Sequence, residues 1–209
     1  MLTLSQLVLF SAASLVLIFT PGPDIIYVMT RGMAQGRKAA LAAAAGFALG
    51  NLVHTCFAIV GLSALLASSA TAFQLVKYAG ALYLVYLGVR MLRGGGGITG
   101  GTAGQPLRHL VIFRQSIIAN VLNPKVAIFF LALFPQFIIG GRGDAPLQMI
   151  LLGTTFVILT MAGFGLVALG AGRVGDWLQR QPRLADRVGQ LAGGVLVGLG
   201  LRLAWPEQH

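Results

Sequence analysis

The feature that most limits the fold is a series of six apolar runs joined by mostly short polar segments. The runs are roughly residues 4–33, 42–67, 73–92, 111–139, 147–170 and 189–205. About 20 apolar residues are needed for an α-helix to cross a bilayer, and each run is close to or above that length. Charged residues are only 10% of the chain, against about 25% in soluble domains. The sequence therefore predicts an all-α membrane protein with six transmembrane helices and excludes a soluble globular fold.

A glycine-rich segment, residues 94–107, divides the six runs three and three. Its composition is typical of a flexible linker. We expect a single transporter domain over 1–209, with repeat one at about 1–93 and repeat two at about 108–205. Because each half holds an odd number of helices, the two repeats should be inverted relative to one another. At an offset of 112 residues, five residues of the third run are identical to five of the sixth. The matches are Leu84, Val85, Leu87, Gly88 and Arg90 with Leu196, Val197, Leu199, Gly200 and Arg202. They support the repeats only weakly, because chance could also produce them.

The basic residues predict the orientation in the membrane. Eleven Lys and Arg follow the first, third and fifth runs, and three lie on the other side. Lys and Arg concentrate in cytoplasmic loops, so we expect both termini outside the inner membrane. The net charge of +10 then faces anionic membrane lipid rather than nucleic acid, because no helix carries a basic face. Residues 1–20 hold no Lys or Arg, so we expect a retained first helix rather than a cleaved signal.

Two of the runs are interrupted by proline. Pro21, Gly22 and Pro23 break the first run, and Asn123 with Pro124 breaks the fourth. Proline removes a backbone donor and disfavours helix at the residue before it. Within lipid such a break is tolerated only where protein or a water-filled cavity satisfies the freed groups. Each break falls in the first helix of its half, which is the pattern of a transporter binding site; a simple kink is the alternative.

Polar residues accompany both breaks. Asp24 is the only acidic residue within any apolar run, and Lys125 lies about 21 Å from either end of its run, too far to reach the interface simply. The predicted substrate-binding residues are Pro21, Gly22, Pro23, Asp24, Asn51, Asn120, Asn123, Pro124 and Lys125. In the alternative interpretation, Asp24 only caps a helix and Lys125 pairs with Asp24 or with carbonyls freed at the breaks. The asparagines would then only join helices.

The second run carries His54 beside Asn51, with Gly46, Gly50 and Gly61 on the same face. A glycine face is where another helix packs closely. His54 and Asp24 are candidate proton-relay groups, although a histidine satisfied within the core is the alternative for His54. Small-residue pairs at 189/193 and 194/198 favour helix packing, either within the chain or across a homodimer.

The residues needed for catalysis do not occur in recognisable patterns. Cys56 is the single cysteine, so the chain forms no internal disulfide. No nucleotide-binding, HExxH or GxSxG motif is present, and no His/Cys/Asp/Glu cluster has metal-ligand spacing. We therefore expect no enzyme activity, no cofactor and no metal. Any energy for transport should come from an ion gradient or the membrane potential.

A set of motifs in order along the chain resembles the lysine exporter superfamily, in its homoserine/threonine-resistance (LysE/RhtB) branch. The motifs are Thr20-Pro21-Gly22-Pro23, Arg31-Gly32-x-x-x-Gly36, Gly46-x-x-x-Gly50-Asn51, Lys77-x-x-Gly80-x-x-Tyr83-Leu84-x-x-Leu87-Gly88, Asn120-x-x-Asn123-Pro124-Lys125 and Phe134-Pro135-Gln136-Phe137. The resemblance implies a six-helix inner-membrane exporter of an amino acid or close derivative (homoserine-, threonine-, leucine- or lysine-like), driven by proton-motive force. Asp24 stands where many relatives are expected to carry asparagine.

Two other functions fit the composition less well. A cation or heavy-metal exporter should hold several membrane carboxylates or thiolates, and the apolar runs offer Asp24 and Cys56. A non-transporting membrane scaffold gives no reason for two polar helix breaks.

Overall fold

The computed structural model describes residues 2–68, 70–93, 106–138, 145–180 and 182–205, and these residues are helical with no strand. The elements are α1 (Leu4–Phe19), α2 (Pro23–Gln35), α3 (Arg37–Ser68), α4 (Ala70–Leu92), α5 (His109–Val121), α6 (Pro124–Ile128), the π-helix η1 (Phe129–Leu133), the 3-10 helix η2 (Phe134–Phe137), α7 (Ala145–Arg180) and α8 (Pro182–Ala204). The predicted all-α class is confirmed. Most of the predicted linker, residues 94–105, lies outside the described residues.

Two helical stretches within the described residues are long and apolar enough to cross a membrane alone. They are residues 37–61 of α3 and 145–170 of α7. Two bent pairs, α1 with α2 and α5 with the segment 124–137, qualify together, which brings the candidate spans to as many as four. The predicted runs 73–92 and 189–205 are helical as α4 and α8. Six spans remain a prediction.

Both helix breaks occur where the prolines require them. α1 ends at Phe19, Gly22 is extended before the first turn of α2, and the two axes differ by 57°. At the second break the Asn123 side chain accepts a hydrogen bond from Lys125 N, and Pro124 begins α6. Asparagine before proline is a favoured helix start because proline needs no amide partner there. The bend at this second break is 48°.

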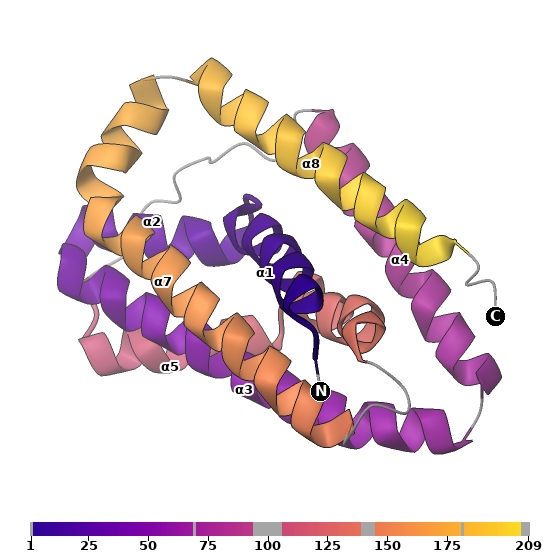
Figure 1. The fold of residues 1–209 in the computed structure, drawn as a ribbon. Helices are drawn as coiled ribbons and strands as arrows, with labels where there is room; N and C mark the ends of the chain where they lie inside the picture. The colour runs from indigo at the N-terminus through magenta and orange to yellow at the C-terminus, as the bar shows by residue number, and fades with distance from the viewer. Residues whose placement is uncertain (1, 69, 94–105, 139–144, 181, 206–209) are drawn as a thin grey trace.

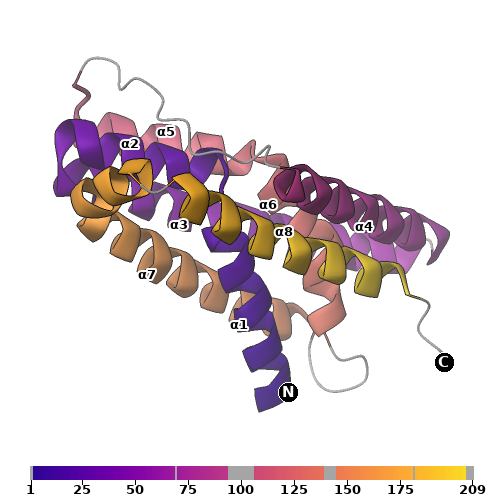
Figure 2. The same cartoon turned by 90° about the horizontal axis from the view of Figure 1, so that it is seen from above.

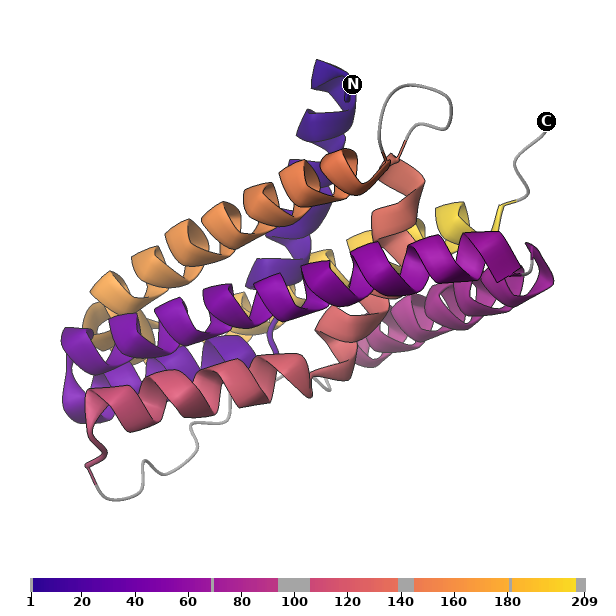
Figure 3. The same cartoon turned by 90° about the horizontal axis from the view of Figure 1, so that it is seen from below.

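The helices form two groups that meet at the breaks. α3 contacts α5, α7 and α2, and these elements run side by side in Figures 1 and 3. α4 and α8 pack along one another and form a second group. α1 crosses against α7, and its N-terminal end projects beyond the other helices in Figure 2. The C-terminal end of α1 thereby lies inside the bundle.

Phenylalanine rings hold α1, the end of the second broken run, and α7 together. Phe10, Phe129, Phe130, Phe134 and Phe156 are all buried, and neighbouring ring centroids in this cluster lie 4.8–6.4 Å apart. Such aromatic pairs contribute about 0.5–1.5 kcal/mol each beyond the area they bury. The cluster therefore packs α1 and α7 against the end of the second broken run.

Glycine allows α3 to approach α5 closely, as the sequence predicts. A Cβ atom on Gly50 would lie 2.6 Å from Asn120 Oδ1, and one on Gly46 would lie 2.6 Å from Ser116 Cβ. The expectation is wrong for Gly61, which faces open space.

The glycines of α8 also include some that pack closely against another helix and some that do not. Gly200 packs tightly on α4, whereas Gly194 and Gly198 face open space within the described chain. Contact through the 194/198 pair inside this chain is therefore not observed, and a homodimer contact there remains a prediction.

Candidate functional site

The two helix breaks meet through one amide side chain. Asn123 Nδ2 donates a 2.6 Å hydrogen bond to Asp24 Oδ1, while Asn123 Oδ1 accepts from Lys125 N at 3.0 Å. Both side chains are almost fully buried. A single residue thus begins α6 and holds the carboxylate in the first turn of α2. The second carboxylate oxygen of Asp24 has no hydrogen-bond donor among the described residues.

Lys125 contacts the backbone of the other break. Its Nζ donates to Leu17 O at 3.2 Å and Thr20 O at 3.3 Å, and its side chain is only 5% exposed. These carbonyls are left without helical partners where α1 ends, and they carry the negative end of its dipole. A buried cation in this position contributes up to about 2 kcal/mol. A Cβ on Gly22 would lie 3.1 Å from Lys125 Nζ, so glycine leaves room for the ammonium group.

Asp24 and Lys125 make no direct ion pair in the part of the chain that the structure describes. Their opposite charges attract across the space between them. Of the structural roles open to Lys125 from the sequence, pairing with freed carbonyls is the one observed.

His54 lies on α3 against the end of α5. Its Nε2 is 3.0 Å from Asn120 O, and its ring stacks on Phe130 with centroids 5.4 Å apart. Because a carbonyl oxygen only accepts, the proton in this contact belongs to Nε2, and Nδ1 is then the acceptor of the neutral ring. His54 therefore has the contacts of a satisfied core histidine in this conformation, and its proton-relay role stays a prediction.

Asn51 is linked to a residue that the sequence did not single out. Asn51 Nδ2 donates to Thr160 Oγ1 at 3.0 Å, and Thr160 Oγ1 donates to Phe156 O at 2.8 Å. Both side chains are buried. Thr160 is one of three threonines in the apolar run 147–170, and nothing in its sequence context separates it from the others.

Two buried oxygen atoms at this place have no hydrogen-bond partner among the described residues. They are Asn51 Oδ1 and Asn120 Oδ1, each on a side chain that is 1% exposed. Leaving a buried acceptor unsatisfied costs about 1–3 kcal/mol. Such atoms are uncommon in native proteins, so these two oxygens mark a place where a hydrogen-bond donor would be favourable.

A small cavity lies at these groups. It encloses about 10 Å³ of space for the centre of a water molecule, which is enough for about one water. Its lining residues are Leu17, Ile18, Asp24, Asn51, Asn120, Lys125, Val126, Phe156, Thr160 and Phe164. The cavity therefore has no room for a molecule larger than water in this conformation.

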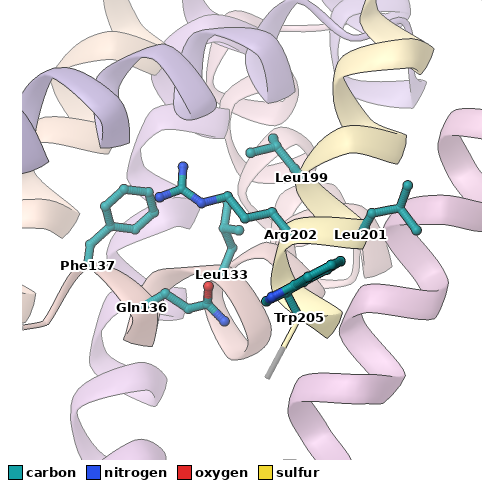
Figure 4. Close-up of a pocket in the computed structure, with 7 residues that line it drawn as sticks. All are labelled: Leu133, Gln136, Phe137, Leu199, Leu201, Arg202 and Trp205. Carbon is teal, nitrogen blue, oxygen red and sulfur yellow. The ribbon is translucent and has the colours of Figure 1, made fainter. Parts of the chain in front are cut away.

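A larger cavity, about 530 Å³ by the same measure, lies elsewhere. Figure 4 shows the Arg202 guanidinium reaching toward the Phe137 ring, with Gln136 and Trp205 below it. Leu133, Gln136 and Phe137 lie at the end of the second broken run, Arg202 lies in the last turn of α8, and Trp205 directly follows α8. None of the sequence-predicted site residues lines this cavity. Its described lining residues include the Arg202 cation and the Gln136 amide but no carboxylate.

The structure brings all the predicted binding residues to one region. Pro21, Gly22, Pro23 and Pro124 form the breaks themselves. Asp24, Asn51, Asn120 and Lys125 line the small cavity, and Asn123 joins its two sides. His54 contacts the backbone of Asn120 but does not line the cavity.

Comparison with known proteins agrees with the family resemblance that the sequence motifs indicate. Residues 15–206 match the family model described as LysE type translocator. An uncharacterized membrane protein of Vibrio cholerae is 35% identical over 88% of this chain and 89% of its own length. A homoserine/homoserine lactone efflux protein of Salmonella typhimurium is 32% identical over 91% of this chain and 92% of its own. A leucine efflux protein of an Enterobacter species is 29% identical over 90% of each chain.

No solved structure matches this chain significantly. The family match covers both helix breaks, the α3 glycines and the α4–α8 pair. The chain belongs to the LysE type translocator family of membrane transport proteins.

Proposed function

We propose that this protein is an efflux carrier for an amino acid or a close derivative, and that the two helix breaks form its binding site. The family and the relatives named for homoserine and leucine efflux support the substrate class. The observation that carries the proposal is the Asn123–Asp24 hydrogen bond. It joins two broken helices at a buried place that holds one anion and one cation.

The two charges suit a zwitterion. Asp24 takes the α-ammonium group, and Lys125 takes the carboxylate after leaving the carbonyls of α1. Burying a net charge is costly, because each unpaired ion loses its hydration. A zwitterion adds no net charge to a site whose own formal charges cancel, so it fits better than a simple cation or anion.

Substrate entry needs the two half-helices to move apart. The cavity has room for about one water, and an amino acid is several times larger. Motion of one repeat against the other around a central site is how broken-helix transporters alternate access. The bends beside the site supply the hinges for this motion.

The proposed architecture is six spans in two inverted repeats, in the inner membrane with both termini outside. The α4–α8 contact supports the repeats. A Cβ on Gly88 would lie 2.5 Å from Gly193 O, and one on Gly200 would lie 2.8 Å from Ala81 O. Gly88 and Ala81 each precede their counterparts, Gly200 and Gly193, by the same 112 residues. The contacts are therefore reciprocal, as a two-fold axis requires.

The carrier is proposed to use proton-motive force, with Asp24 and His54 as relay groups. Both are buried near the breaks, and ionisable groups inside membrane bundles commonly mark proton paths. The site needs no cofactor in this scheme.

Efflux from proteoliposomes tests the function directly. Vesicles are loaded in parallel with labelled leucine, homoserine, threonine and lysine, and a proton gradient is imposed. We expect vesicles that carry the purified protein to export at least one of the neutral amino acids faster than protein-free vesicles. Release of none of the four above this control would overturn the proposal.

A further inference from the structure

We propose that the small cavity is the ammonium pocket of the carrier, and that Thr160 positions it. In this assignment the substrate's ammonium group is bound by Asp24 together with the side-chain oxygens of Asn51 and Asn120. Thr160 also lines the cavity, and its role in this assignment is to fix the Asn51 amide so that the Asn51 oxygen points away from Thr160. The inference rests on the proposed amino-acid transport and adds the groups that recognise one end of the substrate.

The orientation of Asn51 follows from a chain of hydrogen bonds. The Thr160 hydroxyl gives its only proton to Phe156 O at 2.8 Å. Its oxygen can then only accept, so it selects the NH₂ end of Asn51, which lies 3.0 Å away. If the Asn51 amide were flipped, its Oδ1 would face Thr160 Oγ1, and two acceptors would be in contact. Asn51 Oδ1 is therefore held away from Thr160.

Residues that line the cavity carry acceptor oxygens that have no hydrogen-bond donor, although Lys125 also lines it. Asn51 Oδ1 and Asn120 Oδ1 have no partner among the described residues, and the second oxygen of Asp24 has no donor there either. The matching ligand is a group with three N–H donors and a positive charge, which is the inventory of a primary ammonium. An ammonium nitrogen is close to a water oxygen in size, and the cavity has space for one such atom.

The charge of the surroundings distinguishes an ammonium from a metal cation. Lys125 lines the same cavity and is buried. Because Asp24 already offsets the charge of Lys125, a bound metal cation would leave the buried site with a net positive charge. The ammonium of a zwitterion brings its own carboxylate, which Lys125 attracts, so the buried site stays neutral.

Thr160→Val removes the hydroxyl while keeping the shape of the side chain. Thr155→Val is the matched control, because Thr155 lies on the same helix and donates to Leu151 O at 2.8 Å, but it is only half-buried and does not line the small cavity. Thr160→Ser keeps the hydroxyl and serves as the rescue. The probes are labelled leucine and its 2-hydroxy analogue, in which a hydroxyl replaces the ammonium group.

We expect Thr160→Val to raise the half-saturating leucine concentration about tenfold, equivalent to about 1.4 kcal/mol, with little change in the maximum rate. The 2-hydroxy analogue should be a poor substrate of the unmodified carrier and should be affected little by the change. Thr160→Ser should restore the leucine value, and Thr155→Val should leave it unaltered.

Several results would overturn the inference. One is a half-saturating leucine concentration that is the same in Thr160→Val as in Thr155→Val. Another is an equal rise in the half-saturating concentrations of leucine and the 2-hydroxy analogue in Thr160→Val, which indicates only a structural role. If Thr160→Val fails to insert, the unmodified carrier still decides, because transport of the 2-hydroxy analogue as fast as leucine excludes an ammonium pocket. Failure of the unmodified carrier to export any amino acid of the panel rejects the proposed function itself.

Discussion

Asn123 and Asp24 lie 99 residues apart in the chain and are joined by a 2.6 Å hydrogen bond between the two broken helices. The same Asn123 side chain caps α6 through Lys125 N. One side chain therefore sets both the start of a half-helix and the position of the buried carboxylate. Its two functions can be separated by substitution.

Asn123→Ala should lower stability by losing both bonds. A helix N-cap contributes about 1 kcal/mol, and leaving the Asp24 oxygen without its donor adds about 1–3 kcal/mol. Asn123→Asp keeps a capping oxygen but sets a second carboxylate against Asp24, so it should be less stable than Asn123→Ala. Thermal unfolding in detergent measures both. If Asn123→Asp is as stable as the unmodified protein, the bond to Asp24 contributes nothing.

Lys125→Met should abolish export while the protein still inserts in the membrane, because the substrate carboxylate loses its cation. Asp24→Asn should weaken export less, since asparagine is expected at this position in many relatives. Initial efflux rates, corrected for protein in the membrane, measure this.

Export at the unmodified rate by both variants would reject the two-charge site. A different result would identify a structural pair. In that case each single variant unfolds, and Asp24→Asn combined with Lys125→Met restores folding.

Gly50→Ala should destabilise the α3–α5 contact. Its Cβ would lie 2.6 Å from Asn120 Oδ1 and 2.7 Å from Asn120 Cβ. Overpacking of this kind costs about 1–3 kcal/mol, more than the gain of up to about 1 kcal/mol from placing alanine in a helix. Gly61→Ala on the same helix is the control and should be neutral or stabilising, because no atom lies within 4 Å. Equal melting temperatures for the two variants would argue against the close packing.

Both termini should lie outside the membrane. A reporter that is active only in the periplasm should be active when fused after His209, and one active only in the cytoplasm should be silent. The physical reason is the excess of Lys and Arg in the loops after the first, third and fifth runs. The reverse pattern of reporter activity would invert the proposed orientation.

Export should depend on the proton gradient and not on ATP. We expect ATP-depleted cells to keep exporting while a proton gradient is imposed, and an uncoupler to stop them, because the chain has no nucleotide-binding motif. The measurement is efflux of labelled substrate under the four combinations of ATP and gradient. Export that follows ATP in uncoupled vesicles would require a partner subunit.

Local sequence was enough to predict the helices and where two of them break. Pro21 and Pro23 cannot continue α1, and Asn123 before Pro124 is a favoured helix start, so both breaks follow from bonds within a few residues. The lengths of the apolar runs similarly predict the helices in which these breaks lie. The sequence alone was enough to single out the predicted binding residues, because polar groups within apolar runs are unusual whatever the fold.

What those polar groups contact depended on the tertiary structure. Lys125 Nζ binds Leu17 O and Thr20 O more than a hundred residues away, and it does not pair with Asp24 directly. Thr160 is a candidate positioning residue only because the packing of α3 on α7 places it against Asn51. Backbone hydrogen bonds within a helix are set by neighbours in sequence, whereas side-chain contacts between helices depend on how distant segments pack. The sequence by itself therefore determined the breaks, and only the packing decided which charges and oxygens face the cavity between them.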